Sequence, residues 1–169
     1  MMDWKVTSRS NVSLSLADVK KHLRLLPNDT SEDTLIEPLI TASLEYCEDE
    51  TGQAFATETI QVTADAALEI QLPRTPVTSV TRVMVGGEET EDYTVDSFGR
   101  VTFPEIVEDI VITYTAGMAE LPLSIRQAML LLIAHWYENR EAVAIGSIAS
   151  VQPKLGVAEL IRHERRWWF

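Results

Sequence analysis

The apolar positions of this chain change their spacing along the sequence, and these changes separate helical from strand-forming stretches. Between residues 14 and 52 they recur every three or four positions, which predicts two helices. We expect Ser15 to cap the first helix and Gly52 to end the second. The second helix contains Pro38, so it is expected either to start late or to kink there. Between residues 57 and 115 apolar and polar positions alternate, which predicts short strands with tight turns.

The last third of the chain returns to helical spacing. Residues 124–141 form a third helix in this interpretation, with Ser124 and Gln127 as a capping box at its start. Residues 142–155 hold small side chains and few apolar anchors, which predicts a mobile loop. Residues 156–169 are expected to form a short C-terminal helix and a tail.

Together these patterns predict an α+β fold. A small bundle of about four helices is expected to carry a small antiparallel β-sheet inserted between the second and third helices. The length of 169 residues and mass of 19.0 kDa favour a single domain over residues 1–169. A hydrophobic content of 46% is ordinary for a folded domain, so a disordered or low-complexity chain is excluded.

The charge and the cysteine content limit which kinds of protein this chain can be. The chain has 14 Lys+Arg against 26 Asp+Glu and a formal net charge of −12, which argues against a stand-alone nucleic-acid binder. The lone Cys47 excludes a disulfide framework, and its place on an apolar helical stripe favours a core residue over a reactive thiol. No targeting signal or membrane-spanning stretch is visible, so we expect a protein that is soluble and made in a cytoplasm.

No motif in the chain indicates catalysis. A glycine-rich phosphate loop and a nucleophile elbow are missing. His135 and Glu138 could begin a metal site, but two further ligands are lacking, and a packed histidine is favoured. The acidic clusters at 45–50 and 88–92 lack the ligand spacing of a calcium loop and are expected to be solvated faces. We therefore assign no catalytic residue, no cofactor and no metal ligand, and keep a metal- or ligand-binding enzyme domain as an alternative.

One long stretch carries a family resemblance. Residues 122–141 read PLSIRQAMLLLIAHWYENRE, which resembles the signature helix of tailed-bacteriophage head–tail connector (adaptor) proteins. Those proteins share its Pro-x-x-Ile-Arg-Gln-Ala beginning and its Ala-His-Trp-Tyr-Glu-Asn-Arg-Glu end. Further stretches are similar to the family in the same order: 16–24, 33–42, 50–52, 72–80 and 114–117. The similarity extends from about residue 14 to residue 167.

The resemblance implies a virion structural protein rather than an enzyme. About a dozen copies would form a ring below the capsid portal, extend the DNA channel and present a platform for a stopper or tail-completion protein. Genome DNA would pass through the channel without sequence-specific binding, and the negative charge of the chain suits such a lumen. The protein would be assembled in the host cytoplasm and reside at the head–tail junction of the virion. A related tail-completion protein is the remaining alternative.

Two sets of residues are expected to contact other chains. The third helix is apolar on nearly every side, which is typical of a helix that also packs against a neighbouring subunit. Its predicted ring-interface residues are Leu130, Leu131, Ala134 and Tyr137. The loop and the aromatic, arginine-rich tail are expected to dock on the portal or a neighbouring subunit, with folding of the tail over its own helices as the alternative. That second set is Ile145, Ile148, Val151, Arg162, Arg165, Arg166, Trp167, Trp168 and Phe169.

Overall fold

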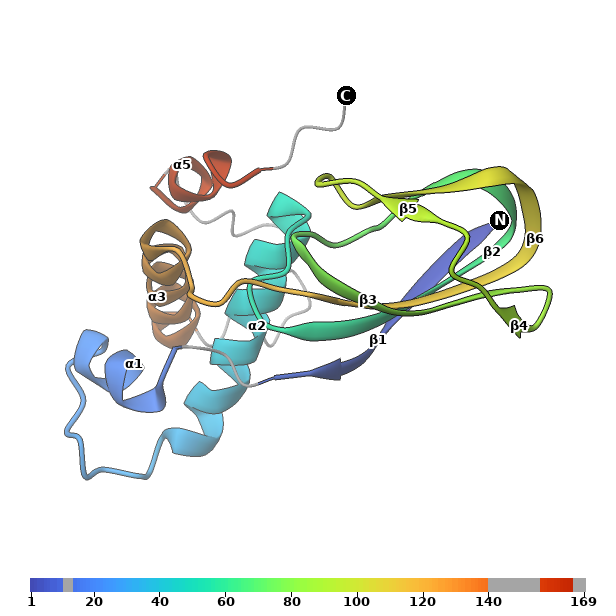
Figure 1. Cartoon of the computed structure of the whole chain (residues 1–169). Coiled ribbons are helices and arrows are strands. Elements are labelled where there is room, and N and C mark those ends of the chain that lie inside the picture. Colours follow the sequence, from blue (N-terminus) through green and yellow to red (C-terminus); the bar gives the residue numbers. More distant parts are fainter. Residues whose placement is uncertain (11–13, 140–155, 166–169) are drawn as a thin grey trace. The chain divides into compact units, whose positions relative to one another are not determined.

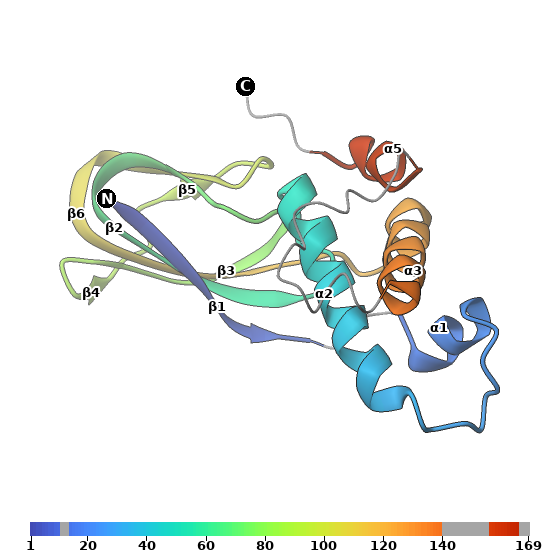
Figure 2. The ribbon, with the colours of Figure 1, turned by 180° about the vertical axis from the view of Figure 1, so that it is seen from behind.

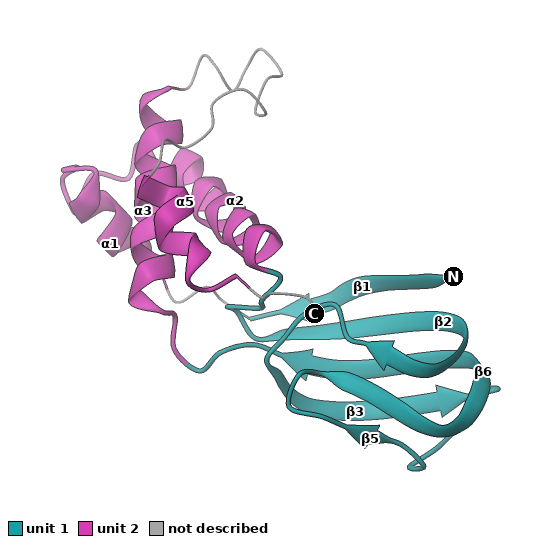
Figure 3. Ribbon diagram, turned by 90° about the horizontal axis from the view of Figure 1, so that it is seen from above, with its two compact units in different colours: residues 1–11, 52–119 teal, residues 12–51, 120–169 magenta. Residues whose placement is uncertain are grey.

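A computed structural model describes residues 1–10, 14–139 and 156–165 of the chain. The chain divides into two compact units, shown in different colours in Figure 3. One unit contains the strands and consists of residues 1–11 and 52–119. The other contains the helices and consists of residues 12–51 and 120–169. The chain therefore begins in the strand unit, returns to it at residue 52 and leaves it again after residue 119, and each unit is described by itself below.

The strand unit is one antiparallel sheet of six strands in the order β1-β2-β6-β3-β4, with β5 paired to β6 (Figure 1). Its strands are β1 (Met2–Arg9), β2 (Glu58–Gln71), β3 (Val77–Val85), β4 (Glu88–Glu89), β5 (Thr94–Val95) and β6 (Arg100–Ala116). The two longest, β2 and β6, pair along both halves of their length and curl over together (Figures 1 and 2). Their register shifts between Ala67 and Glu69, where a bulge allows the bend.

The curl of β2 and β6 encloses the core of this unit. Alternate residues of the paired strands point into it, as a period of two requires. Tyr114 is fully buried there, and its hydroxyl donates to the Arg74 carbonyl at 3.3 Å and accepts from the Arg74 amide at 3.2 Å. The main buried residues are Ile60, Val62, Ile70, Leu72, Val83, Val101, Phe103, Ile110, Ile112 and Tyr114. This core is made by residues of a single sheet that folds over itself.

The helical unit contains four described helices: α1 (Leu16–His22), α2 (Asp33–Thr51), α3 (Leu123–Glu138) and α5 (Gly156–Arg162). Helix α3 contacts each of the other three (Figure 2). Ser15 caps α1 by accepting the Asp18 amide at 3.1 Å, as the sequence predicts. The connection from α1 to α2 is held by the buried Lys20, whose ammonium lies 2.5 Å from the Asp33 carboxylate and donates to the Asp29 carbonyl at 2.8 Å.

The architecture corrects two expectations about the sheet. Strand β1 comes before the helices, so the sheet is not purely an insertion between the second and third helices. The sheet is also larger than expected, because the apolar stretches near Val101 and Ile112 belong to one long strand, β6. Pro104 and Asp109 lie within that strand, and Asp109 has a positive φ of 52°. The α+β class is confirmed, whereas the small inserted sheet is wrong.

One expectation about the helices is wrong, and one of two alternatives for α2 is removed. The capping box of the third helix is wrong: the residue before α3 is Pro122, and no side chain caps the helix. The Ser124 hydroxyl instead donates to the Glu164 carboxylate at 2.9 Å. Helix α2 begins at Asp33 and includes Pro38, so it does not start late. It ends before Gly52, whose φ of 71° is the left-handed conformation that terminates helices.

Candidate interaction surfaces

The predicted ring-interface residues on α3 differ in how much surface they retain. Leu130 is only 6% exposed, so it packs within its own chain. Leu131 is 37% exposed, and Ala134 and Tyr137 are half-buried. Leu131 is therefore the most exposed of the four, and their assignment to a ring interface stays a prediction.

The opposite side of α3 forms the core of the helical unit. Ile125, Met129, Leu132 and Ile133 are buried completely. Trp136 packs its ring against Tyr46 of α2 edge-on, with ring centroids 6.4 Å apart and an interplanar angle of 82°. The helix is apolar on several sides because one side fills this core while Leu131 remains at the surface.

The tail begins with contacts to its own chain. The Arg165 guanidinium lies 2.5 Å from the Glu50 carboxylate, and its Nε donates to the Glu50 carbonyl at 3.1 Å. Arg162 is exposed and pairs with Glu159 at 2.9 Å, one turn earlier on α5. Arg165 therefore contacts its own helical unit, and the docking role of Arg162 and Arg165 stays a prediction.

The remaining predicted docking residues lie outside the described part of the chain. They are Ile145, Ile148 and Val151 of the loop, and Arg166, Trp167, Trp168 and Phe169 of the tail. Their role in docking stays a prediction.

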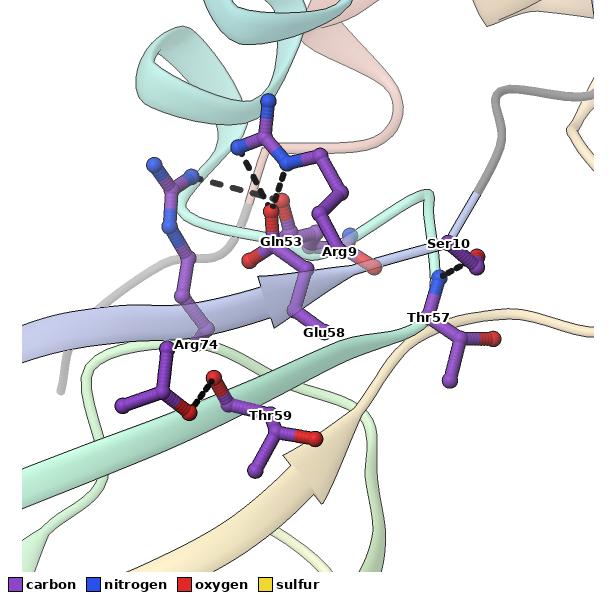
Figure 4. Close-up of polar contacts among 8 residues, drawn as sticks. Arg9, Ser10, Gln53, Thr57, Glu58, Thr59 and Arg74 are labelled. Carbon is purple, nitrogen blue, oxygen red and sulfur yellow. Dashed lines mark hydrogen bonds and ion pairs between the residues drawn. The ribbon is translucent and has the colours of Figure 1, made fainter.

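A buried ion pair joins the first two strands of the sheet (Figure 4). Arg9 and Glu58 face each other in the β1–β2 register. Both the Nε and an Nη of Arg9 lie 2.6 Å from one Glu58 carboxylate oxygen, and the Glu58 side chain has no exposed surface. The second carboxylate oxygen has no hydrogen-bond partner among the described residues. A charge this deeply buried depends on its partner, so Arg9 fixes the end of β1 against β2.

A second arginine covers the aromatic residue of β1. The guanidinium carbon of Arg74 lies 5.6 Å from the centroid of the Trp4 ring, within the range of a cation–π contact. Arg74 is 7% exposed and donates weakly to the Gln53 carbonyl at 3.4 Å (Figure 4). Trp4 itself remains 38% exposed. The face of β1 that carries Trp4 is therefore a partly open apolar surface, which the sequence patterns did not indicate.

The only cysteine and the helical histidine of α3 both lie in structural surroundings. Cys47 is completely buried, and burial, with Glu48 and Glu50 adding to it, raises the pKa of its thiol to about 12. This confirms a core residue rather than a reactive thiol. Nδ1 of His135 lies 3.4 Å from the Asn139 amide, at the end of α3. Within residues 1–10, 14–139 and 156–165, no group of three or more His, Cys, Asp or Glu side chains could hold a metal ion.

The acidic clusters behave differently from each other. Glu88 and Glu89 lie on β4 and are exposed, as expected of a solvated face. In the first cluster, Glu45 and Asp49 are exposed but Glu48 has no exposed surface. The expectation of a wholly solvated face at 45–50 is therefore wrong at Glu48.

Comparison with known families identifies the chain. A family model described as Head completion protein matches residues 13–163. The chain belongs to the head completion protein family. This confirms the head–tail connector resemblance seen in the α3 sequence, because the match includes that helix and every other described helix and strand except β1. No curated protein matches the chain in sequence.

Solved structures with the same fold come from gene transfer agent (GTA) particles. A chain from the neck of an empty GTA particle, computed with C6 symmetry, is 24% identical, with a TM-score of 0.78 over 100% of this chain and 97% of that one. A chain from the virion of a native GTA particle is 22% identical, with a TM-score of 0.77 over 98% and 96%. A chain from the neck of a native GTA particle, computed with C12 symmetry, is 20% identical, with a TM-score of 0.68 over 96% and 97%. At these identities the likeness shows a shared fold.

None of the described helices has the length and apolar character needed to span a lipid bilayer.

Proposed function

We propose that this head completion protein is a structural subunit of a virion neck, where copies of the chain form a ring that joins the head to the tail. Family membership over residues 13–163 is the observation that carries this proposal. The fold likeness to neck chains supports it, because it spans the whole chain and those necks were computed with C6 and C12 symmetry. We propose a ring of about a dozen copies below the portal, with a stopper or tail-completion protein beneath it.

In this proposal the work of the protein is mechanical rather than catalytic. The described residues offer no metal-binding cluster, and the only cysteine is a buried, protonated thiol. A net charge of −12 suits a ring around DNA, because acidic surfaces repel phosphates and allow the genome to pass without adhering. The neck function is therefore favoured over an enzyme that uses its acidic clusters to hold a metal.

Neighbouring subunits are proposed to meet through α3. Leu131 is the best candidate contact, because it is a large apolar side chain that is 37% exposed in the middle of the helix. Fully burying a leucine contributes about 1.5–3 kcal/mol, so covering the exposed third of Leu131 contributes about 0.5–1 kcal/mol per interface. A cyclic ring repeats the same contact around its circumference, so a single substitution alters every interface at once.

Reconstitution tests the proposed function. DNA-filled heads from a strain that lacks the gene are mixed with purified protein and tails, and tailed particles are counted by electron microscopy. We expect the wild-type chain to restore tailed particles and Leu131→Glu to restore far fewer. Leu123→Glu is the matched control, because Leu123 is on the same helix and 82% exposed but lies outside the predicted interface set.

Circular dichroism of both variants separates assembly from folding. Restoration by a folded Leu131→Glu variant would show that α3 is wrongly assigned as the interface. Failure of the wild-type protein to promote tail joining would contradict the neck function itself.

A further inference from the structure

The outer edge of β1 is an unpaired strand edge within the described part of the chain, because β1 pairs only with β2 (Figure 1). The Asp65 amide donates to the Met1 carbonyl at 3.3 Å, so the backbone of Met1 faces β2. Backbone polar groups alternate in direction along a strand, so those of the next two odd-numbered residues also face β2. The groups that point away from the sheet belong to Met2, Trp4 and Val6.

The same three residues expose apolar side chains. Met2 is 48% exposed, Trp4 38% and Val6 37%. Trp4 and Val6 lie opposite Val62 and Ile60 of β2, which belong to the buried core. Directly opposed residues of antiparallel strands share one face of the sheet, so the exposed stripe continues the core face beyond its last strand. A strand paired to this edge would place its own side chains beside these three and bury part of their surface.

The other face of β1 carries one charge of each sign. The Asp3 carboxylate accepts the Trp4 amide at 2.8 Å, which occupies the central outward-pointing donor of the edge. Lys5 has no ion-pair partner among the residues that the structure describes. A carboxylate that covers an edge N–H and a lysine on an edge strand both discourage indiscriminate strand pairing. The charges of Asp3 and Lys5 also define which strand could pair with β1, because that strand must place an opposite charge across from each.

We propose that β1 pairs with β1 of a second copy of this chain, antiparallel and around a two-fold axis at Trp4. In this register Asp3 lies opposite Lys5 of the second copy, and Lys5 lies opposite its Asp3. Met2 lies opposite Val6, and the two Trp4 residues face each other. The Trp4 amide leaves the Asp3 carboxylate and donates to the Trp4 carbonyl across the axis, while the freed carboxylate pairs with the lysine.

Charge complementarity selects a second copy as the occupant. Centring the antiparallel pair on Trp4 places opposite charges together on one face and apolar residues together on the other, with no mismatched position between Met2 and Val6. Opposed charges and aromatic pairs each stabilise a strand pair, whereas like charges opposite each other destabilise it. The sequence of β1 is therefore complementary to itself.

This contact is distinct from the ring of the proposed function. Copies in a cyclic ring meet through two different surfaces, whereas a two-fold contact uses the same surface on both copies. We therefore assign the β1 pairing to free subunits, and it can fail without affecting the neck function.

Charge-swap variants of the full chain test the pairing by sedimentation equilibrium in the submillimolar range. Wild type is expected to dimerise. Asp3→Lys and Lys5→Asp should each raise the dimer Kd about tenfold or more, because each variant places two pairs of like charges together. A mixture of the two single variants should form heterodimers, since the two lysines of one copy then lie opposite the two aspartates of the other. The double variant D3K/K5D should dimerise as wild type does.

Amide hydrogen exchange gives an independent measurement and a control. On dimerisation the amides of Trp4 and Val6 should gain protection, while those of Asp3 and Lys5, already bonded to β2, should change little.

Asp3→Asn removes the charge but keeps an acceptor for the Trp4 amide, so it should weaken the dimer less than Asp3→Lys. A chain that stays monomeric throughout this range overturns the proposal. Single variants that dimerise as wild type does, or a mixture that stays monomeric, also overturn it.

Discussion

Replacing Arg9 by methionine tests whether the buried ion pair between β1 and β2 holds the sheet edge. Methionine keeps much of the length and apolar stem of arginine but removes the guanidinium. Glu58 would then be an unpaired carboxylate with no exposed surface. Breaking a buried pair in this way costs about 3–5 kcal/mol. The Arg9 side chain is 23% exposed, so water reaches the site once it is removed, and we expect a loss of about 3 kcal/mol.

The measurement must report on the strand unit, because the chain has two compact units that need not unfold together. Native-state hydrogen exchange of β2 and β6 amides as a function of urea gives the free energy of opening of this unit. Glu58→Gln is the matched variant: it removes the buried charge and leaves an arginine that can turn to solvent, so we expect it to cost about 1–2 kcal/mol. The double variant R9M/E58Q should be more stable than Arg9→Met alone.

Two outcomes would refute the reasoning about this pair. One is an Arg9→Met variant that loses less than about 1 kcal/mol, the cost of an ordinary exposed pair. The other is a double variant less stable than Arg9→Met, which would mean that the carboxylate stabilises the sheet without its arginine.

Other features allow further predictions. Gly117→Ala should lower the melting temperature far more than Gly87→Ala. Both residues have positive φ, but a Cβ at Gly117 would lie 2.5 Å from the Ala56 carbonyl oxygen, whereas a Cβ at Gly87 would have no atom within 4 Å. Hydrogen bonds from Ser15 and then Arg126 hold the pKa of Asp18 below its ordinary value. The ionised carboxylate therefore stabilises the fold at pH values above the ordinary pKa, and this stabilisation is lost as pH falls through the lowered pKa. Ser15→Ala should raise the pKa of Asp18 in an NMR titration. The Cys47 thiol should resist alkylation at pH ~8 until denaturant is added, given its pKa of about 12. EDTA should leave the melting temperature unchanged, and a drop of several degrees would reveal a structural metal.

Local signals in the sequence were sufficient for the helices. The stripe of α2 and the hydroxyl of Ser15 identify their elements because capping and amphipathic packing depend on residues within a turn or two. The α3 capping box failed because Ser124 has a competing partner, Glu164, forty residues away. A pattern of neighbours cannot reveal such a long-range contact.

The sheet shows the same limit. Strand β1 has a visible alternation at Met2, Trp4 and Val6, but only its pairing with β2, about sixty residues later, makes it a strand. Pro104 suggests a break between two strands, but β6 continues through it as one strand that bends where its register with β2 shifts.

The candidate interface was predictable as a helix but not as individual residues. Because α3 is apolar nearly all round, its periodicity does not distinguish the buried Leu130 from the exposed Leu131. That difference depends on where α2 and α5 pack, which the sequence of α3 does not contain.

Cryo-electron microscopy of necks reconstituted from heads and this purified protein tests the central claim most directly. The neck function predicts a closed ring of about a dozen copies below the portal, with the fold of both units recognisable in each copy and α3 against the adjacent subunit. Necks that bind no copies, or that bind single copies without closing a ring, would contradict it.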